Sequence, residues 1–289
     1  MTTKKQTIPP FICVYGNSGI GKTTDMGFAF PNALFVASAG ATKSIVSTCG
    51  YQPREIQLHT VEQATQTVQQ MADGKIEGDA IVIDDFSYMV EASLSKMQEK
   101  YTGWTVYGKL RDEIFRFRRI ARESNITVAL NCWLAMPTTL EDGSLKRGCP
   151  KLPSDYGENI PAMCDLVLRG DVYRQHKPHP YAYYADSSVE WVGKDRDGGT
   201  PSPAPMNLAE ILRLNGYDVP RLVDWQEEKV ENLSLMIDEQ GRKIAKEMYG
   251  QLLEKLPDNP HLAYWTVRDA LDRSILRKAK ANRWNAIKF

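Results

Sequence analysis

The 289-residue sequence predicts an α/β fold, in which helices flank both faces of a mostly parallel sheet, with a helical appendage at the C-terminal end. Short apolar runs alternate with helical patterns up to about residue 200, an order typical of a parallel sheet with helical connections. The stretch "GGTPSPAP" at residues 198–205 then precludes regular structure. Past Tyr217 the pattern is helical alone. We therefore expect a core at residues 1–217 and a helical extension at residues 218–289.

Apolar periodicity places the individual elements. A short helix after the first strand should stop at Pro31, and the longest helix should run from about Thr105 to Ser124, because apolar residues recur there every three or four positions. Helical patterns also run from Val230 to Leu252, with Gly241 as a candidate interruption, and from an N-cap at Asp258 or Asn259 to Ile275. The expected strands are Phe11–Tyr15, Ala33–Ala37, Ala80–Ile83, Thr127–Cys132 and Asp165–Leu168, followed by Tyr181–Asp186 and Val189–Val192 as a pair that fits a hairpin.

Composition excludes several classes of function. The 36 Lys and Arg balance the 36 Asp and Glu, so no overall field draws the molecule to nucleic acid or to an anionic membrane. The five scattered cysteines contain no Cys-x-x-Cys pair, which indicates a reducing compartment and no zinc site. No apolar run approaches the roughly 20 residues that span a bilayer, and the polar start "MTTKKQTIPP" does not fit a signal peptide. We expect a cytoplasmic protein without a membrane partner.

The stretch "YGNSGIGKTT" carries the strongest chemical signal. It follows an apolar strand, precedes a helix and fills the pattern G-x-x-x-x-G-K-[ST] of a phosphate-binding loop. Glycines let backbone N–H groups turn toward phosphates, Lys22 neutralises phosphate charge, and the Thr23 hydroxyl can ligate Mg²⁺. The alternative is an ordinary glycine turn before a helix. The expected nucleotide-binding residues are Gly16, Asn17, Ser18, Gly19, Ile20, Gly21, Lys22, Thr23 and Thr24.

Two acids complete the expected metal site. In "DAIVIDDFSYM" four apolar residues deliver Asp84 at the carboxyl end of a buried strand, the Walker B position. In P-loop enzymes this carboxylate holds Mg²⁺, and the acid after it often orients the attacking water. We therefore assign Asp84 to Mg²⁺ and Asp85 to water activation, against the alternative that either acid at this strand end faces solvent.

Three further stretches resemble a known family. They are "YGKLRDEIFRFRRIARESNITVALNCW", "PKLPSDYGENIPAMCDLVLR" and "WVGKDRDGGTP". Together with the loop and Asp84 they resemble the phage-encoded RecA-like P-loop ATPases, also described as phage nucleotide-binding or AAA ATPases, some of which are linked to single-strand annealing and recombination. The resemblance spans roughly Ile12 to Leu214. It implies a RecA-like core that binds ATP and Mg²⁺.

The resemblance carries three residues over. Asn131 ends the strand after Walker B, where relatives place a polar residue that senses the γ-phosphate; a solvent-capping Asn is the alternative. Lys194 and Arg196 in "GKDRDGG" resemble the K-x-R-x-G element with which RecA-like enzymes reach the nucleotide of a neighbouring subunit; a charged turn is the alternative. The carry-over implies a homo-oligomer, either a ring or a filament.

One departure from the family pattern concerns hydrolysis. RecA-like enzymes place a catalytic glutamate at the end of the second strand, whereas "LFVASAGATKS" offers Ser38 and no acid. Either Asp85 takes that role or ATP turnover is slow.

These observations leave two functions open. The first is a Mg²⁺-dependent, oligomeric ATPase that acts on single-stranded DNA in phage recombination, replication or repair in the host cytoplasm. The second is a nucleotide-stabilised assembly or virion-associated structural protein with slow or no turnover. A small-molecule kinase fits poorly, because the Arg-rich segment 116–122 lies on an expected long helix rather than in a lid. A basic stripe beside an aromatic at Arg273, Arg277, Lys280 and Trp284 fits nucleic acid or simply a solvated face.

Overall fold

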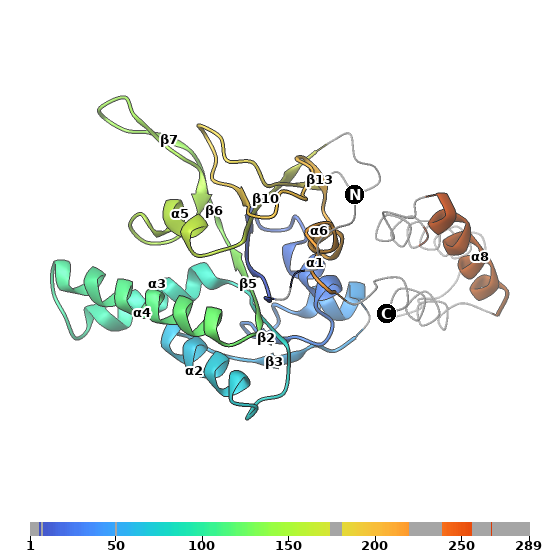
Figure 1. Cartoon of the computed structure of the whole chain (residues 1–289), viewed down its shortest axis with the longest axis horizontal. Helices are drawn as coiled ribbons and strands as arrows, with labels where there is room; N and C mark the ends of the chain where they lie inside the picture. Colours follow the sequence, from blue (N-terminus) through green and yellow to red (C-terminus); the bar gives the residue numbers. More distant parts are fainter. Residues whose placement is uncertain are drawn as a thin grey trace, which may run out of the picture. The chain divides into compact units, whose positions relative to one another are not determined.

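The computed structural model describes residues 6, 8–49, 51–173, 181–219, 239–255 and 267 (Figure 1). The chain divides into two compact units, residues 1–175 with 181–220, and residues 176–180 with 221–289. In the second unit the structure describes helix α8 (Glu239–Lys255), which passes through Gly241. The second expected C-terminal helix, apart from Val267, and the basic stripe at Arg273, Arg277, Lys280 and Trp284 lie outside the described residues.

The first unit is built on one twisted sheet with the strand order β13-β11-β10-β1-β5-β4-β2-β3. Its strands from β10 to β3 are all parallel, and antiparallel pairs occur only at the β10 end. The strands are β1 (Phe11–Gly16), β2 (Leu34–Val36), β3 (Arg54–Ile56), β4 (Ala80–Ile83), β5 (Thr127–Cys132), β10 (Leu166–Val172), β11 (Tyr181–Tyr184), β12 (Lys194–Asp195) and β13 (Ala204–Pro205).

Helices cover both faces of this sheet, so the predicted fold class is confirmed (Figure 1). The first unit contains α1 (Lys22–Ala29), α2 (Val61–Ala72), α3 (Phe86–Gln98), α4 (Trp104–Glu123), α5 (Tyr156–Asn159) and α6 (Leu208–Leu214), with short η1 (Ile45–Cys49) and η2 (Ile160–Ala162). Helices α2, α3 and α4 pack together on one face, and α1 contacts α6 on the other. No helix among the described residues is long and apolar enough to span a membrane.

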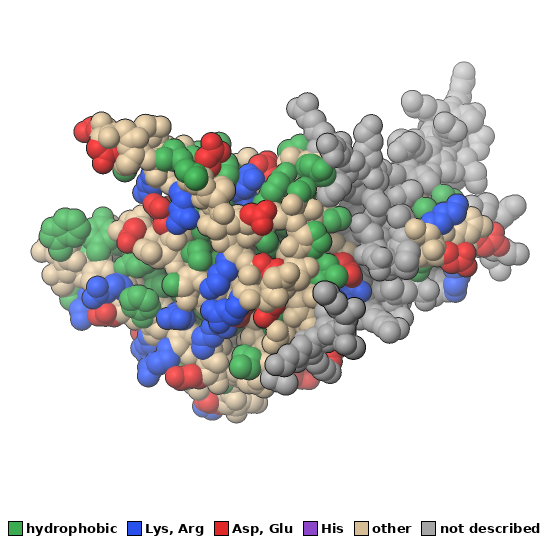
Figure 2. Space-filling view, turned by 45° about the horizontal axis from the view of Figure 1, so that its top comes forward, with side chains coloured by type: hydrophobic (Ala, Val, Ile, Leu, Met, Phe, Trp, Pro, Cys, Tyr) green, Lys and Arg blue, Asp and Glu red, His purple; other side chains and the backbone are tan. Residues whose placement is uncertain are grey.

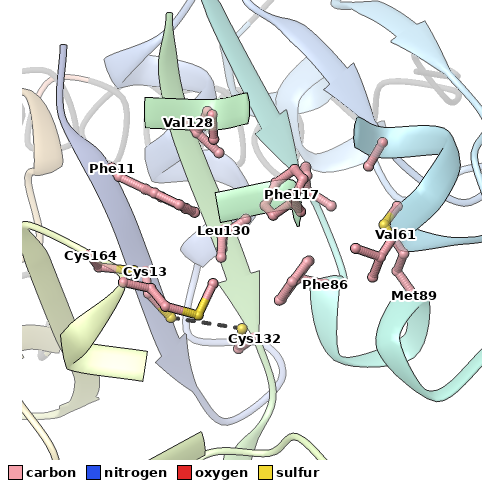
Figure 3. Close-up of a cluster of buried hydrophobic side chains, with 14 of the residues drawn as sticks. Phe11, Cys13, Val61, Phe86, Met89, Phe117, Val128, Leu130, Cys132 and Cys164 are labelled. Carbon is pink, nitrogen blue, oxygen red and sulfur yellow. Dashed lines mark hydrogen bonds between the residues drawn. The ribbon is translucent and has the colours of Figure 1, made fainter. Parts of the chain in front are cut away.

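A buried hydrophobic core lies between the sheet and helices α2–α4 (Figure 3). Side chains alternate between the faces of a strand, so Phe11 and Cys13 of β1 point toward α4. The Phe117 ring lies edge-on to Phe11, with ring centroids 6.0 Å apart, and stacks on Phe86 at 5.9 Å. The Cys13 and Cys132 sulfurs lie 3.8 Å apart within this apolar cluster. These contacts therefore pack β1, β5 and the start of α3 against α4.

A long excursion follows β5. Strand β6 (Leu134–Ala135) pairs with β9 (Cys149–Pro150), and between them β7 (Thr138–Thr139) and β8 (Leu145–Lys146) form a hairpin that extends away from the sheet (Figure 1). These strands were not predicted from the sequence, because two-residue strands leave no periodic pattern.

The hairpin expected between Tyr181–Asp186 and Val189–Val192 is wrong. Strand β11 instead pairs antiparallel with β10 on one side and with β13 on the other. The second run forms no strand, and Trp191 makes only an isolated bridge with Gly148.

Candidate active site

The glycine-rich loop lies between β1 and α1, at the carboxyl edge of the parallel strands. Gly19 (φ 82°) and Gly21 (φ 101°) adopt left-handed conformations that other residues rarely reach. Gly21 caps the N-terminus of α1, so the positive end of the helix dipole faces the loop. The Lys22 ammonium folds back and donates hydrogen bonds to the carbonyl oxygens of Gly16 (2.8 Å) and Asn17 (2.9 Å). This arrangement could hold an anion, and we refer to it as the cradle.

Gly16 has a packing role that the sequence motif does not reveal. A Cβ atom at this position would lie 2.6 Å from the Gly170 carbonyl oxygen of β10 and 2.6 Å from Cδ1 of Ile20. Gly170 is subject to the same limit, since its Cβ would also lie 2.6 Å from the Ile20 side chain. The two glycines face each other in register on β1 and β10 and leave room for Ile20, which anchors the loop.

Three polar side chains converge beside the loop. The Thr23 hydroxyl donates to the Asp84 carboxylate, at 3.0 Å from Oδ1 and 3.1 Å from Oδ2. The Asn131 amide donates to Asp84 Oδ1 and, at 3.3 Å, to the Thr23 oxygen. Asp84 follows β4 and Asn131 lies near the end of β5, so neighbouring parallel strands deliver both residues to the same edge of the sheet.

Burial shifts the pKa values of the charged groups in this cluster. Desolvation raises the pKa of the Asp84 carboxyl, while hydrogen bonds from Asn131 and Thr23 oppose that rise. Desolvation likewise lowers the pKa of the Lys22 ammonium, and the negative charge of Asp84 opposes the change. Each buried charge is therefore stabilised chiefly by groups that would also contact a phosphate or a metal ion.

Asp85 occupies a different position from Asp84. It has a left-handed backbone (φ 69°) and caps the N-terminus of α3, where its carboxylate accepts a hydrogen bond from the Tyr88 N–H at 3.2 Å. Partial burial raises the pKa of Asp85, and the Tyr88 N–H and the Lys22 charge counteract the rise. The carboxylate therefore serves as a helix cap and also lines the site.

These residues line one cavity of about 350 Å³. Its wall is formed by the glycine-rich loop, the chain after β2, and the ends of β4 and β5. The sequence motifs predict most of this wall but not Ala41, Ser44 and Trp133, which belong to no motif. The Trp133 N–H donates to the Ser87 hydroxyl at 3.0 Å, which joins the end of β5 to α3. The lining residues are Ser18, Gly19, Gly21, Lys22, Thr23, Thr24, Ser38, Ala41, Ser44, Asp84, Asp85, Asn131 and Trp133.

Lys194 and Arg196 are not brought to this cavity. Lys194 pairs with Val167, near the amino end of β10, whereas the loop begins opposite Gly170 at the carboxyl end. Three residues of strand separate these levels by roughly 10 Å. The Lys194 ammonium donates to the Pro161 carbonyl, and the Arg196 guanidinium lies 3.0 Å from the Asp165 carboxylate. Within one chain, these two residues are therefore distant from the cradle.

A buried acid in α1 was missed by the sequence analysis. Asp25 is 3% exposed, and its Oδ2 accepts hydrogen bonds from the Tyr183 hydroxyl (2.8 Å) and the Leu208 N–H (3.0 Å). Its Oδ1 is buried and has no partner among the described residues. Burial raises the pKa of Asp25 from 3.8 to about 6. The helix that carries Lys22 and Thr23 is thus fastened to β11 and α6 through a carboxyl that titrates near neutrality.

This carboxyl should make stability depend on pH. Because its folded-state pKa of about 6 exceeds the unfolded value of 3.8, the folded state binds the proton more tightly. The protonated Asp25 carboxyl therefore stabilises the fold fully below pH 3.8. This stabilisation is lost as the pH rises through about 6. In Asp25→Asn the side chain stays neutral at every pH, so its unfolding free energy lacks this pH dependence. The difference in unfolding free energy between the variant and wild type should therefore shift by ~3 kcal/mol in favour of the variant when the pH is raised from below 3.8 to above 6. Urea titrations across this pH range measure the difference, and a pH-independent difference would contradict the assignment.

The polar groups at the loop fit Mg²⁺ and a nucleoside triphosphate. The Thr23 hydroxyl and the Asp84 carboxylate are hard oxygen ligands on adjacent elements, which suits Mg²⁺ bound through one or two side chains together with phosphate oxygens. The backbone N–H groups, Lys22 and the start of α1 supply the anion cradle.

Similarity to known proteins identifies the family of this chain. None of the curated proteins matches the sequence. Solved structures that are similar to it include a KaiC-like protein from the archaeon Pyrococcus horikoshii OT3 (15% identity, TM-score 0.39, 63% of this chain and 85% of that chain) and the RadB recombinase (15% identity, TM-score 0.37, 65% of this chain and 92% of that chain). Residues 8–197 match the model of the AAA domain family. Since this match covers more than half of the chain, the protein belongs to the AAA domain family and is a nucleotide-binding ATPase of the P-loop type.

Proposed function

We propose that the protein is a Mg²⁺-dependent, RecA-like ATPase that assembles as a homo-oligomer and acts on DNA in phage recombination, replication or repair, in the cytoplasm of the host. The observation that carries the nucleotide part is the convergence of Thr23, Asp84 and Asn131 beside Lys22. The DNA and phage parts rest on the family resemblance of the sequence.

The proposed roles follow from the contacts. The Lys22 ammonium exchanges the carbonyls of Gly16 and Asn17 for phosphate oxygens, and the backbone of the loop donates N–H groups to them. Thr23 and Asp84 hold Mg²⁺, which supplies Lewis-acid stabilisation of phosphate charge. The Asn131 amide, which already donates a hydrogen bond to Asp84, is proposed to contact the terminal phosphate and so to couple its presence to the position of β5.

Asp85 is the proposed water-orienting group. It is the one acid besides Asp84 among the described residues that line the cavity. Its raised pKa favours proton acceptance nearer neutral pH, as expected for a general base. The Tyr88 N–H fixes its orientation.

Lys194 and Arg196 are proposed to complete the site of a neighbouring subunit. Their distance from the cradle of their own chain leaves a trans role as the one way in which they can contact nucleotide. Arg196 is half exposed, and its buried partner Asp165 also binds Arg122 at 2.6 Å and the Phe11 N–H at 2.9 Å. Arg196 can therefore leave Asp165 without stranding a buried charge.

Mixed assemblies test the trans role. Arg196→Gln should lower ATP turnover by about 10³-fold or more, the loss typical of an arginine finger. Arg196→Gln subunits have an intact cradle, and Lys22→Met subunits have an intact Arg196. Mixing these two inactive variants should restore part of the turnover, because some interfaces then combine both intact halves. Additive inactivity at every ratio would refute the shared site.

The DNA part requires its own measurement. ATP turnover should rise when single-stranded DNA is added, and the affinity for DNA should differ between the ATP-bound and ADP-bound states. A turnover rate unaffected by DNA, together with absence of DNA binding in every nucleotide state, would remove this part and leave the ATPase.

A second candidate function is supported by Ser38. It lines the cavity where RecA-like enzymes are expected to carry a glutamate, and Asp85 is already engaged as a helix cap. Both observations favour slow hydrolysis in a nucleotide-stabilised assembly, with virion association as one setting. Light scattering with and without ATP distinguishes the candidates, since an assembly of this kind should dissociate when ATP is removed.

A further inference from the structure

Helix α4 presents a continuous stripe of aromatic and arginine side chains that the proposed ATPase chemistry does not use. We call it the α4 stripe and define it as Trp104, Tyr107, Arg111, Phe115 and Arg118. These residues are spaced three, four, four and three positions apart, which places them along one side of a helix. In Figure 2, hydrophobic, basic and acidic side chains lie interspersed in the left part of the view, where both α3 and α4 run in Figure 1.

The aromatic members of the stripe are not part of the core. Trp104 is 89% exposed, Phe115 51% and Tyr107 38%, whereas the adjoining side of α4 is buried against the core. The Trp104 and Tyr107 rings lie side by side, with centroids 6.1 Å apart. Leaving three large rings in water forgoes apolar burial that folding would otherwise gain, and clustered exposed rings mark interaction sites.

The two arginines of the stripe differ in exposure, since Arg111 is exposed and Arg118 is partly buried, with its Nε atom buried and without a hydrogen-bond partner among the described residues. Among the described residues, neither Arg111 nor Arg118 has an ion-pair partner, whereas Arg122, one turn further on, is held by Asp165. The acids of α4 lie off the stripe. Glu113, for example, points toward α2 and α3, where it accepts hydrogen bonds from the Ser93 hydroxyl and the Glu62 N–H. The stripe therefore combines exposed rings with unbalanced positive charge.

We propose that the α4 stripe binds single-stranded nucleic acid, an inference that rests on the DNA part of the proposed function and names the surface that performs it. Bases stack on aromatic rings without regard to sequence, and guanidinium groups bind the phosphates between them. From Trp104 to Arg118 the stripe extends over about 21 Å at 1.5 Å per residue, enough to contact several nucleotides. A duplex hides its bases, so the rings favour a single strand.

The test uses the full-length protein and a fluorescently labelled single-stranded oligothymidylate, with binding followed by anisotropy. Trp104→Ala and Phe115→Ala should each weaken binding by about 5- to 150-fold, the loss expected for one stacked base. In the double variant Arg111→Gln/Arg118→Gln, the slope of log affinity against log salt concentration should become shallower by about 1.4, since each phosphate contact contributes about 0.7.

Arg116→Gln is the matched control. Arg116 lies on the same helix, also has no ion-pair partner among the described residues, and faces the cavity between α2, α3 and α4 instead of the stripe. It should change the affinity little. Equal losses in Arg116→Gln and in the stripe variants would show diffuse electrostatic binding and overturn the proposal.

ATP turnover without DNA, measured on the same variants, separates the outcomes. It should remain at the wild-type rate, because the α4 stripe lies outside the cavity. Wild-type protein that binds DNA while the stripe variants bind equally well would overturn this inference and leave the DNA function intact. If no variant and no wild-type protein binds DNA, the DNA function itself fails. Variants that lose self-association instead would identify the stripe as a contact between copies of the chain, which also overturns the proposal.

Discussion

Lys22→Met should lower ATP turnover by about 10²- to 10³-fold, the loss that follows removal of one preorganised charge at a site where negative charge develops. The methionine retains the apolar stem of lysine, so the change removes the ammonium alone. In wild type that ammonium is already positioned by the Gly16 and Asn17 carbonyls, at 2.8 and 2.9 Å. Steady-state phosphate release at saturating Mg²⁺ and ATP measures the effect.

The fold should survive this change. Lys22→Met removes two hydrogen bonds to loop carbonyls, each with a net value of about 1 kcal/mol, but it also removes a buried charge whose pKa is lowered by desolvation. The two effects oppose each other, so the melting temperature should stay close to that of wild type. Wild-type turnover in a well-folded Lys22→Met protein would show that the loop does not serve catalysis.

Asp84→Asn should lower turnover by about 10²-fold or more and raise the Mg²⁺ concentration needed for half-maximal rate. The carboxylate is a hard anionic ligand, and a neutral amide binds Mg²⁺ more weakly. The amide oxygen can still accept from Thr23 and Asn131, so the local hydrogen bonds persist. Because burial raises the pKa of Asp84, a neutral residue should leave the unfolding free energy unchanged or increase it.

Asp79→Asn is the matched control for this variant. Asp79 is exposed and lies directly before β4, at the end of the strand opposite Asp84. It should leave both turnover and Mg²⁺ dependence at wild-type values. Titrations of turnover against Mg²⁺ for the three proteins decide the matter. If Asp84→Asn and Asp79→Asn behave alike, Asp84 does not hold the metal.

The sequence predicted the strands that form the centre of the sheet, and the reason is physical. Strands β1, β4 and β5 are buried on both faces, so each consists mainly of apolar residues. Helix α4 was equally clear, since five buried residues recur along one side of it. These patterns are local, and a local pattern survives without knowledge of the rest of the fold.

The incorrect hairpin shows the limit of such patterns. Trp191 resembles a strand residue in sequence, but its ring stacks on the guanidinium of Arg169, with the cation 4.2 Å from the ring centroid. It also packs over Gly148, where a Cβ atom would lie 2.4 Å from the ring. The partial burial of Trp191 thus reflects contacts with residues distant in sequence and carries no information on strand pairing.

In the candidate site, too, contiguous motifs were predictable and contacts between distant residues were not. The loop from Gly16 to Thr23 and the Asp84 position are readable because each motif is contiguous in sequence, and the structure brings both to one cavity with Asn131. The partners of Asp25 could not be predicted, since Tyr183 and Leu208 lie more than 150 positions away. The role of Asp85 as a cap for α3 likewise depends on where that helix begins.

Calorimetric titration of the wild-type protein with a non-hydrolysable ATP analogue tests whether Lys22, Thr23 and Asp84 form a Mg²⁺-nucleotide site. We expect saturable binding of one nucleotide per chain, which tightens when Mg²⁺ is present and loses this tightening in Asp84→Asn. Absence of binding, or an affinity that is the same with and without Mg²⁺, would contradict this expectation.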